Sequence, residues 1–215
     1  MFREDVFMGK LRAHCIHVIS VVALFTGLSP VLAAQAKPES AVLLPYASCQ
    51  FSNGLQIVET DPLAPGITSR DVDTDSGQRR IDMKAGVRVM FAYPDTDFYA
   101  NAKAELLPAA NYPELKQFLL DNLQYLAHGN SVNTSLTSPL NGFEAHGLDR
   151  EKLEGGVLGI YLVFDNSAHV VTTIYLLNQE AQSRKFQTIE EYRQLRDSFL
   201  DSYSACIRKN QQNKP

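Results

Sequence analysis

Three neighbouring side chains, Glu144, His146 and Asp149, could carry acid–base chemistry. Histidine titrates near neutral pH, and a carboxylate beside it can orient the ring and tune its proton affinity. Glu144 and His146 are two residues apart, so on a strand they share one face. We therefore name the three as speculative catalytic residues of a site that converges from separate elements. The other interpretation is an ordinary boundary histidine, because this spacing is common by chance.

Motifs that would fix a reaction class are absent from the chain. It has no Gly-x-Ser-x-Gly elbow and no thiol-protease context around a cysteine. Gly155 and Gly156 lead into an expected strand, whereas the glycines of a dinucleotide-binding motif lead into a helix. His128 and His169 lie in other contexts, so zinc could bind only by long-range convergence. We expect no cofactor, with calcium as the one alternative.

The calcium alternative depends on four aspartates: Asp71, Asp73, Asp75 and Asp82. Calcium prefers carboxylate oxygens from alternate residues around a glycine-assisted turn. The match is imperfect, because Gly77 falls one position late and the last ligand is an aspartate instead of a bidentate glutamate. A solvated β-hairpin with a turn at Ser76-Gly77 explains the same residues without metal, and we favour it.

The N-terminal residues have the pattern of a secretory signal peptide. Lys10 and Arg12 precede an apolar run at residues 16–32, and small alanines follow it. The run is short for a membrane helix and contains a glycine and a proline. We therefore expect residues 1–36 to be removed, with cleavage after Ala36.

Two details of this leader stay open. Cleavage after Ala33 is the second choice, and Met8 is a possible true start because Glu4 and Asp5 are unusual in a basic leader. Either way, the mature protein is expected in the periplasm or secreted, with no membrane span after signal removal.

Cys49 and Cys206 are the cysteines that remain once the leader is removed. An even number of cysteines in an exported protein favours a disulfide. Cys49 opens the expected folded region and Cys206 lies near its end, so a bond between them would tie both termini together. Two separate buried thiols are the alternative.

The composition is that of an ordinary globular protein: 215 residues, 45% hydrophobic, 20% charged, and a formal net charge of −4. This balance excludes nucleic acid as a partner, because phosphate binding uses clustered lysine and arginine. We expect one domain at residues 48–207, between an N-terminal tail at 37–47 and a polar C-terminal tail at 208–215.

Hydrophobic alternation predicts a β-rich body. Residues 87–93 and 98–106 alternate around a short turn and should form a hairpin. Residues 157–164 and 170–177 are apolar on both faces, which is typical of a sheet centre. Further strands are expected at residues 55–59, 81–83, 134–137 and 143–146.

Helical spacing of apolar residues predicts two amphipathic helices. One begins at Asn111 and ends before Gly129. The other begins at a capping box formed by Thr188 and Glu191, and its apolar stripe runs to Ile207. The expected class is therefore α+β, a mainly antiparallel sheet packed by two amphipathic helices.

This order of elements resembles the PsbP/Mog1-like layer sandwich. The resemblance is carried by the strand Gly-Val-Leu-Gly-Ile-Tyr-Leu-Val-Phe from Gly156, the strand Ala-His-Val-Val-Thr-Thr-Ile-Tyr-Leu-Leu-Asn from Ala168, and the helix Glu-Glu-Tyr-Arg-Gln-Leu-Arg-Asp-Ser-Phe from Glu190. It covers about half of the mature chain and has no diagnostic motif, so no functional residue is transferred. Since members of this group are mostly non-catalytic, it implies an accessory or binding protein by analogy.

Together these patterns favour an exported, non-catalytic binding or accessory protein. Its expected partner is an envelope or extracellular protein or a small ligand. Two alternatives remain open, a secreted hydrolase with a converged acid/base site and a calcium-stabilised surface module.

Overall fold

The computed structural model describes residues 39–62, 68–94, 96–128, 132–153, 156–177 and 186–213. These residues belong to one compact unit, Ala36–Pro215. The expected signal peptide at residues 1–36 lies outside the described residues. Within them, no helix is both long enough and apolar enough to cross a membrane.

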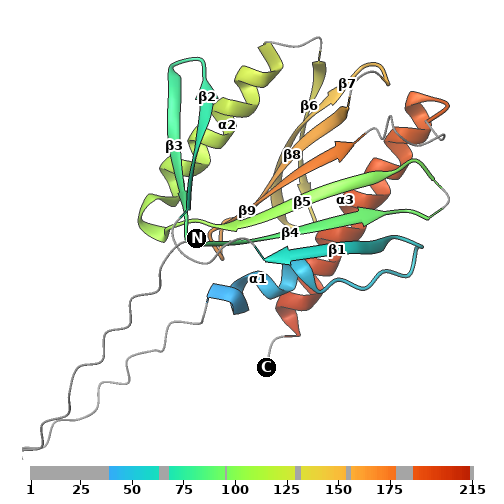
Figure 1. Ribbon diagram of the computed structural model, residues 1–215, viewed down its shortest axis with the longest axis horizontal. Coiled ribbons are helices and arrows are strands. Elements are labelled where there is room, and N and C mark those ends of the chain that lie inside the picture. The colour runs from blue at the N-terminus through green and yellow to red at the C-terminus, as the bar shows by residue number, and fades with distance from the viewer. Residues whose placement is uncertain are drawn as a thin grey trace, which may run out of the picture. The chain divides into compact units, whose positions relative to one another are not determined.

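The protein is an α+β structure, as the sequence predicts (Figure 1). A seven-stranded antiparallel sheet has the order β1-β4-β5-β9-β8-β7-β6, and β2 and β3 form a separate hairpin. The elements are α1 (Glu39–Ala47), β1 (Gln56–Pro62), β2 (Thr68–Thr74), β3 (Gly77–Met83), β4 (Ala85–Ala92), β5 (Tyr99–Leu106), a 3₁₀ turn (Ala109–Asn111), α2 (Tyr112–His128), β6 (Val132–Leu140), β7 (Phe143–Arg150), β8 (Val157–Asp165), β9 (Val170–Leu177) and α3 (Ile189–Gln212).

The predicted strand pairings are confirmed where the sequence signal is strong. β4 and β5 form the expected hairpin, with Val89 opposite Ala102. β9 is the fourth of the seven strands and β8 the fifth, so the two most apolar strands occupy the sheet centre. Since both faces of these strands are covered, alternation is lost and nearly every position is buried.

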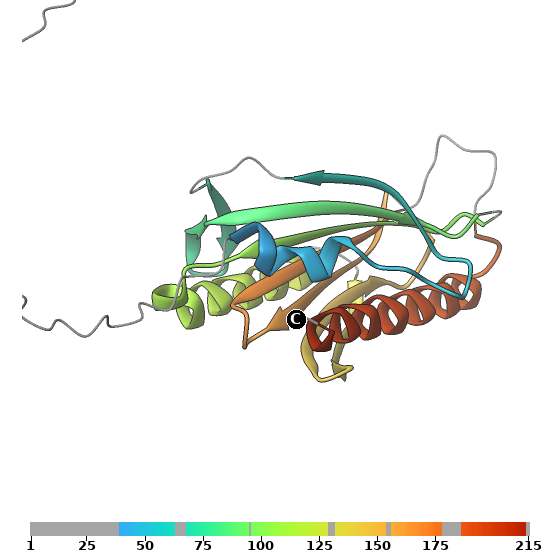
Figure 2. The ribbon, with the colours of Figure 1, turned by 90° about the horizontal axis from the view of Figure 1, so that it is seen from below.

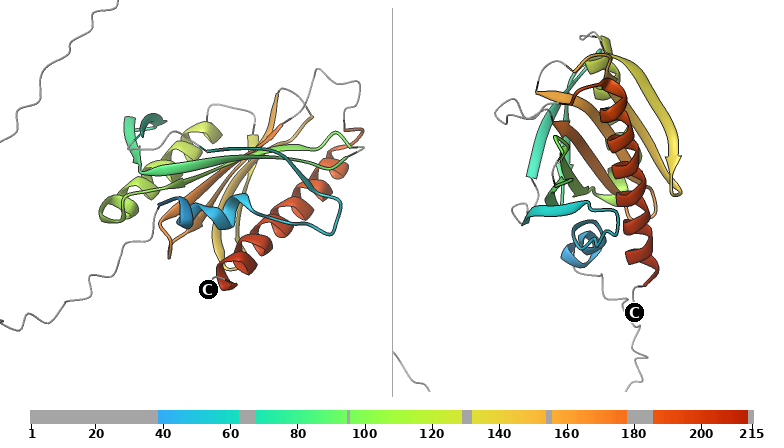
Figure 3. Two further views of the ribbon diagram at one scale, coloured as in Figure 1. Left: turned by 60° about the horizontal axis from the view of Figure 1, so that its bottom comes forward. Right: turned by 90° about the vertical axis from the view of Figure 1, so that its right-hand side faces the viewer.

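Two separate hydrophobic clusters cover the two faces of the sheet. On one face, here called the α3 face, Phe91 of β4 packs against Phe199 and Tyr203 of α3, with ring centroids 5.2 and 4.8 Å apart. On the other, the α2 face, Leu119 of α2 packs with Phe164 of β8 and with residues of the β2–β3 hairpin. Figure 2 shows α2 and α3 against different parts of the sheet, and in the right-hand view of Figure 3 α3 lies in front of the strands and α2 behind them.

The helix ends follow the predicted capping chemistry. The Thr188 side chain accepts a hydrogen bond from the Glu191 backbone N–H at 3.1 Å, and Glu191 accepts one from the Gln187 N–H at 2.9 Å. Thr188 therefore caps α3 as the sequence predicts, whereas Glu191 bonds to the backbone one residue before the capping-box position. α3 continues to Gln212, past the expected end of the domain at residue 207.

The N-terminal segment differs from the expected tail, because residues 39–47 form helix α1. Leu43 and Tyr46 are buried, and the Tyr46 hydroxyl donates to Asp165 Oδ2 at 2.7 Å. The helix is short, contains Pro45 and has no apolar stripe, so its local signal is weak. Tertiary packing on β4 and α3, and not helix propensity, holds it in place.

Cys49 and Cys206 face each other as a candidate disulfide between the end of α1 and α3. Their Cα atoms are 5.8 Å apart, within the range that a disulfide bridges. The predicted pairing of these cysteines therefore fits the geometry.

Candidate functional site

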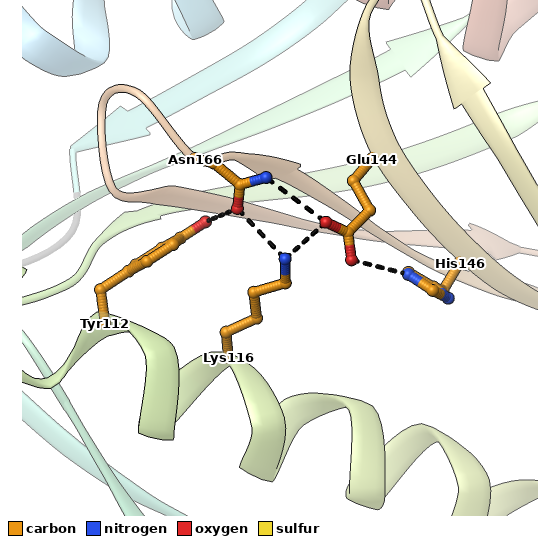
Figure 4. Close-up of polar contacts among 5 residues, drawn as sticks. All are labelled: Tyr112, Lys116, Glu144, His146 and Asn166. Carbon is orange, nitrogen blue, oxygen red and sulfur yellow. Dashed lines mark hydrogen bonds and ion pairs between the residues drawn. The ribbon is translucent and has the colours of Figure 1, made fainter.

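A polar cluster on the α2 face contains two of the residues that the sequence singles out (Figure 4). Glu144 and His146 project from β7 toward α2, where Tyr112 and Lys116 lie one turn apart. Asn166, in the turn between β8 and β9, completes the cluster. The period of β7 places Glu144 and His146 on one face, as predicted.

Glu144 is the centre of this cluster. Its Oε1 lies 3.0 Å from His146 Nε2, and its Oε2 lies 2.5 Å from Lys116 Nζ. The Asn166 amide donates to the same Oε2 at 3.3 Å, while Asn166 Oδ1 accepts from the Tyr112 hydroxyl at 3.0 Å and from Lys116 at 3.2 Å. Both carboxylate oxygens of Glu144 are therefore occupied.

The electrostatics of Glu144 follow from these contacts. Partial burial raises the pKa of its carboxyl group, but hydrogen bonds from Lys116, His146 and Asn166 outweigh that effect and lower the pKa to about 2. A carboxylate with such a low pKa is a poor general base at neutral pH. The cluster is consequently best described as an ion pair that docks α2 on β7.

His146 has the surroundings of a boundary residue. Its side chain is 24% exposed, and its ring lies 6.1 Å from the ring of Phe164, over which Lys116 also sits. The His146 ring is bonded to the Glu144 carboxylate. This contact pairs the imidazole with a carboxylate that can orient it.

Asp149 lies on the opposite face of the sheet from Glu144 and His146. Its buried carboxylate accepts hydrogen bonds from the hydroxyls of Tyr161 and Tyr192, the latter at 2.9 Å, and pairs with Arg196 of α3. Burial and the nearby charge of Asp149 raise the pKa of Tyr161, so its hydroxyl stays a donor. The separation from His146 is odd, and side chains at odd separations on a strand point to opposite faces. The structure therefore brings together two of the three predicted catalytic residues.

The four aspartates of the calcium alternative lie on the β2–β3 hairpin. The hairpin interpretation is confirmed, with a two-residue loop at Asp75-Ser76, one position earlier than expected. Asp71 and Asp73 are exposed, and Asp82 accepts a hydrogen bond from Ser69 at 2.6 Å. Across the described ranges, no group of three or more histidine, cysteine, aspartate or glutamate side chains is placed to hold a metal ion.

An apolar groove lies between α1, the start of β4 and Pro62, the last residue of β1. Its volume is about 610 Å³, and its walls are mainly apolar. We call it the α1–β1 groove, and it is lined by Glu39, Ser40, Leu43, Leu44 and Ala47 of α1, Pro62 of β1, and Ala85, Gly86 and Val87 of β4. Leu44, in the wall of the groove, is 58% exposed.

Sequence reasoning misses this groove, because it predicts no helix at residues 39–47. The one feature of the sequence that could have indicated the groove is the pair Leu43-Leu44, of which the structure buries the first and exposes the second. A leucine pair in a short segment without periodicity does not distinguish a core contact from a binding surface.

Comparisons with known proteins do not assign a function. No protein family, no curated protein and no solved structure matches this chain. The resemblance to the PsbP/Mog1-like sandwich therefore stays a prediction.

Proposed function

We propose that this protein is an exported, non-catalytic binding protein, periplasmic or secreted, that holds an apolar segment of a partner protein in the α1–β1 groove. The main support for this proposal is the groove itself. Its volume of about 610 Å³ lies in the range of protein binding sites, and its lining is apolar with a single charged side chain, Glu39. The Cys49–Cys206 pair supports export, because disulfides persist in oxidising compartments.

The two alternative functions have less support. A hydrolase site would need Glu144, His146 and Asp149 to converge, and they lie on two faces of the sheet. A calcium-stabilised module would need the aspartates of the β2–β3 hairpin to converge, and its extended strands hold them apart.

The groove is tested with N-phenyl-1-naphthylamine, an uncharged dye that fluoresces in apolar sites. We expect saturable binding to the protein and at least tenfold weaker binding to Leu44→Asp. Covering a leucine is worth about 1.5–3 kcal/mol, and each 1.4 kcal/mol is about tenfold in affinity. Because Leu44 is 58% exposed, the substitution should leave the fold intact, which far-ultraviolet circular dichroism checks.

Tyr125→Asp is the matched control. Tyr125 is a 40% exposed hydrophobic residue on α2, outside the groove. Equal loss of dye binding in both variants, or no binding to the unmodified protein, would overturn the proposed function.

A further inference from the structure

The strand that borders the α1–β1 groove is an open edge. β1 ends the seven-stranded sheet, and no strand pairs with its outer side among the described residues. Most of its side chains are exposed, including Val58 at 51%. An edge strand presents backbone N–H and C=O groups to which another chain can pair.

The register of β1 on β4 shows which side chains an added extended chain would meet on each face of that edge. Thr60 lies opposite Val89 and Pro62 opposite Val87, so this set points to the α3 face, where the groove lies. The intervening set, Glu59 and Asp61, points to the α2 face. An added strand would therefore direct alternate side chains toward the α3 face, where those beside Pro62 would meet the apolar groove, and the others beside two carboxylates.

The charges on β1 indicate which residues of an added strand would fit beside Glu59 and Asp61. The Glu59 and Asp61 side chains are 50% and 41% exposed, and both share one cation, Arg88 of β4. Two carboxylates with one guanidinium leave a net negative charge, and Glu39 in the groove adds another. Lysine or arginine opposite Glu59 and Asp61 would complement this charge.

The same charges argue against a second copy of this chain as the occupant. Antiparallel pairing of two β1 strands would bring acidic residues of both copies together, and like charges opposite each other destabilise a sheet.

We infer that β1 and the α1–β1 groove bind an extended segment of a partner protein as an added strand, with apolar residues at alternate positions and lysine or arginine between them. This inference rests on the proposed function and specifies the partner's chemistry.

Two labelled peptides of identical composition test the inference by fluorescence anisotropy. One alternates valine and lysine, and the other places all valines before all lysines. We expect the alternating peptide to bind at least tenfold tighter, since only it places valines toward the groove and lysines toward the carboxylates. Methylating the backbone nitrogens of every second residue, in the phase that faces β1, should weaken binding at least tenfold, because it removes the strand hydrogen bonds.

A charge variant, Glu59→Gln with Asp61→Asn, tests the lysine set. We expect it to lose about tenfold in affinity for the alternating peptide, a few-fold for each exposed charge pair. The control, Glu114→Gln with Glu151→Gln, removes two exposed carboxylates away from β1 and should bind as the unmodified protein does. Circular dichroism confirms that both variants are folded.

The outcomes separate the two proposals. Equal binding of both peptides, or binding insensitive to N-methylation, overturns the strand inference even where the naphthylamine dye still binds and Leu44→Asp abolishes it. Absence of dye binding to the unmodified protein overturns the proposed function itself.

Discussion

At the residue scale, Glu144 links the acid stability of the protein to the contact between α2 and β7. Its folded pKa is about 2 and its ordinary value 4.5, so its ionised form stabilises the fold above pH about 4.5. That contribution is lost as the pH falls from about 4.5 toward 2. Because the side chain is 36% exposed, solvent screening keeps it to about 1 kcal/mol or less.

Glu144→Gln should therefore lower the free energy of unfolding by about 0.5–1 kcal/mol at pH 7 and by progressively less on acidification to pH 3. Urea unfolding at pH 7, 5 and 3 measures this difference. Glu151→Gln, at an exposed position, is the control. A difference that is constant with pH, or that grows toward pH 3, would contradict the assignment.

The sequence predicts part of the residue-scale arrangement. The Glu144–His146 contact follows from strand periodicity alone. Lys116 and Asn166 complete the cluster from α2 and the β8–β9 turn, and no pattern in the chain indicates which helix face meets which strand. The odd spacing of Asp149 from Glu144 places it on the opposite face by the same periodicity, but no pattern indicates that Tyr192 of α3 meets it there.

At the element scale, Asp149 anchors the first half of α3 to β7 and β8. It is 3% exposed and joins Arg196 and Tyr192 of α3 to Tyr161 of β8. Neighbouring glycines leave room for this contact, since a Cβ on Gly159 would lie 2.6 Å from the Tyr192 hydroxyl oxygen. Removing one partner of a buried ion pair leaves the other charge uncompensated.

Asp149→Ala is accordingly expected to lower the free energy of unfolding by about 3 kcal/mol or more, as measured by guanidinium unfolding at pH 7. Asp197→Ala is a matched control, because Asp197 also pairs with Arg196 but its side chain is 63% exposed. That control should cost at most about 1 kcal/mol. Equal losses in the two variants would refute the anchoring role.

The elements themselves differ in how well the sequence predicts them. α2 and α3 have long apolar stripes, α3 also has a clear N-cap, and β8 and β9 are apolar throughout, so their existence follows from pattern. α1 has no apolar stripe, and its position depends on contacts such as the Tyr46–Asp165 hydrogen bond, which joins residues far apart in the chain. The groove that α1 forms was therefore beyond prediction.

At the scale of the whole molecule, the Cys49–Cys206 pair closes a loop that contains nearly all of the described fold. The two cysteines are 157 residues apart, and a cross-link of that span removes conformational entropy from the unfolded chain worth about 5 kcal/mol. At about 2–4 °C per kcal/mol for a domain of this size, reduction should lower the melting temperature by roughly 10–20 °C.

Thermal unfolding with and without a phosphine reductant measures this shift. The variant Cys49→Ser with Cys206→Ser should melt at the temperature of the reduced protein and should not respond to the reductant.

The proposed export makes formation of the Cys49–Cys206 bond depend on residues 1–36. Protein produced with those residues should be recovered outside the cytoplasm with residue 37 at its N-terminus and both thiols protected from alkylation. Protein produced in the cytoplasm without them should have thiols that react, because that compartment keeps cysteines reduced. Retention of residues 1–36 on the recovered protein would contradict cleavage, whereas reactive thiols in the exported form would contradict the disulfide.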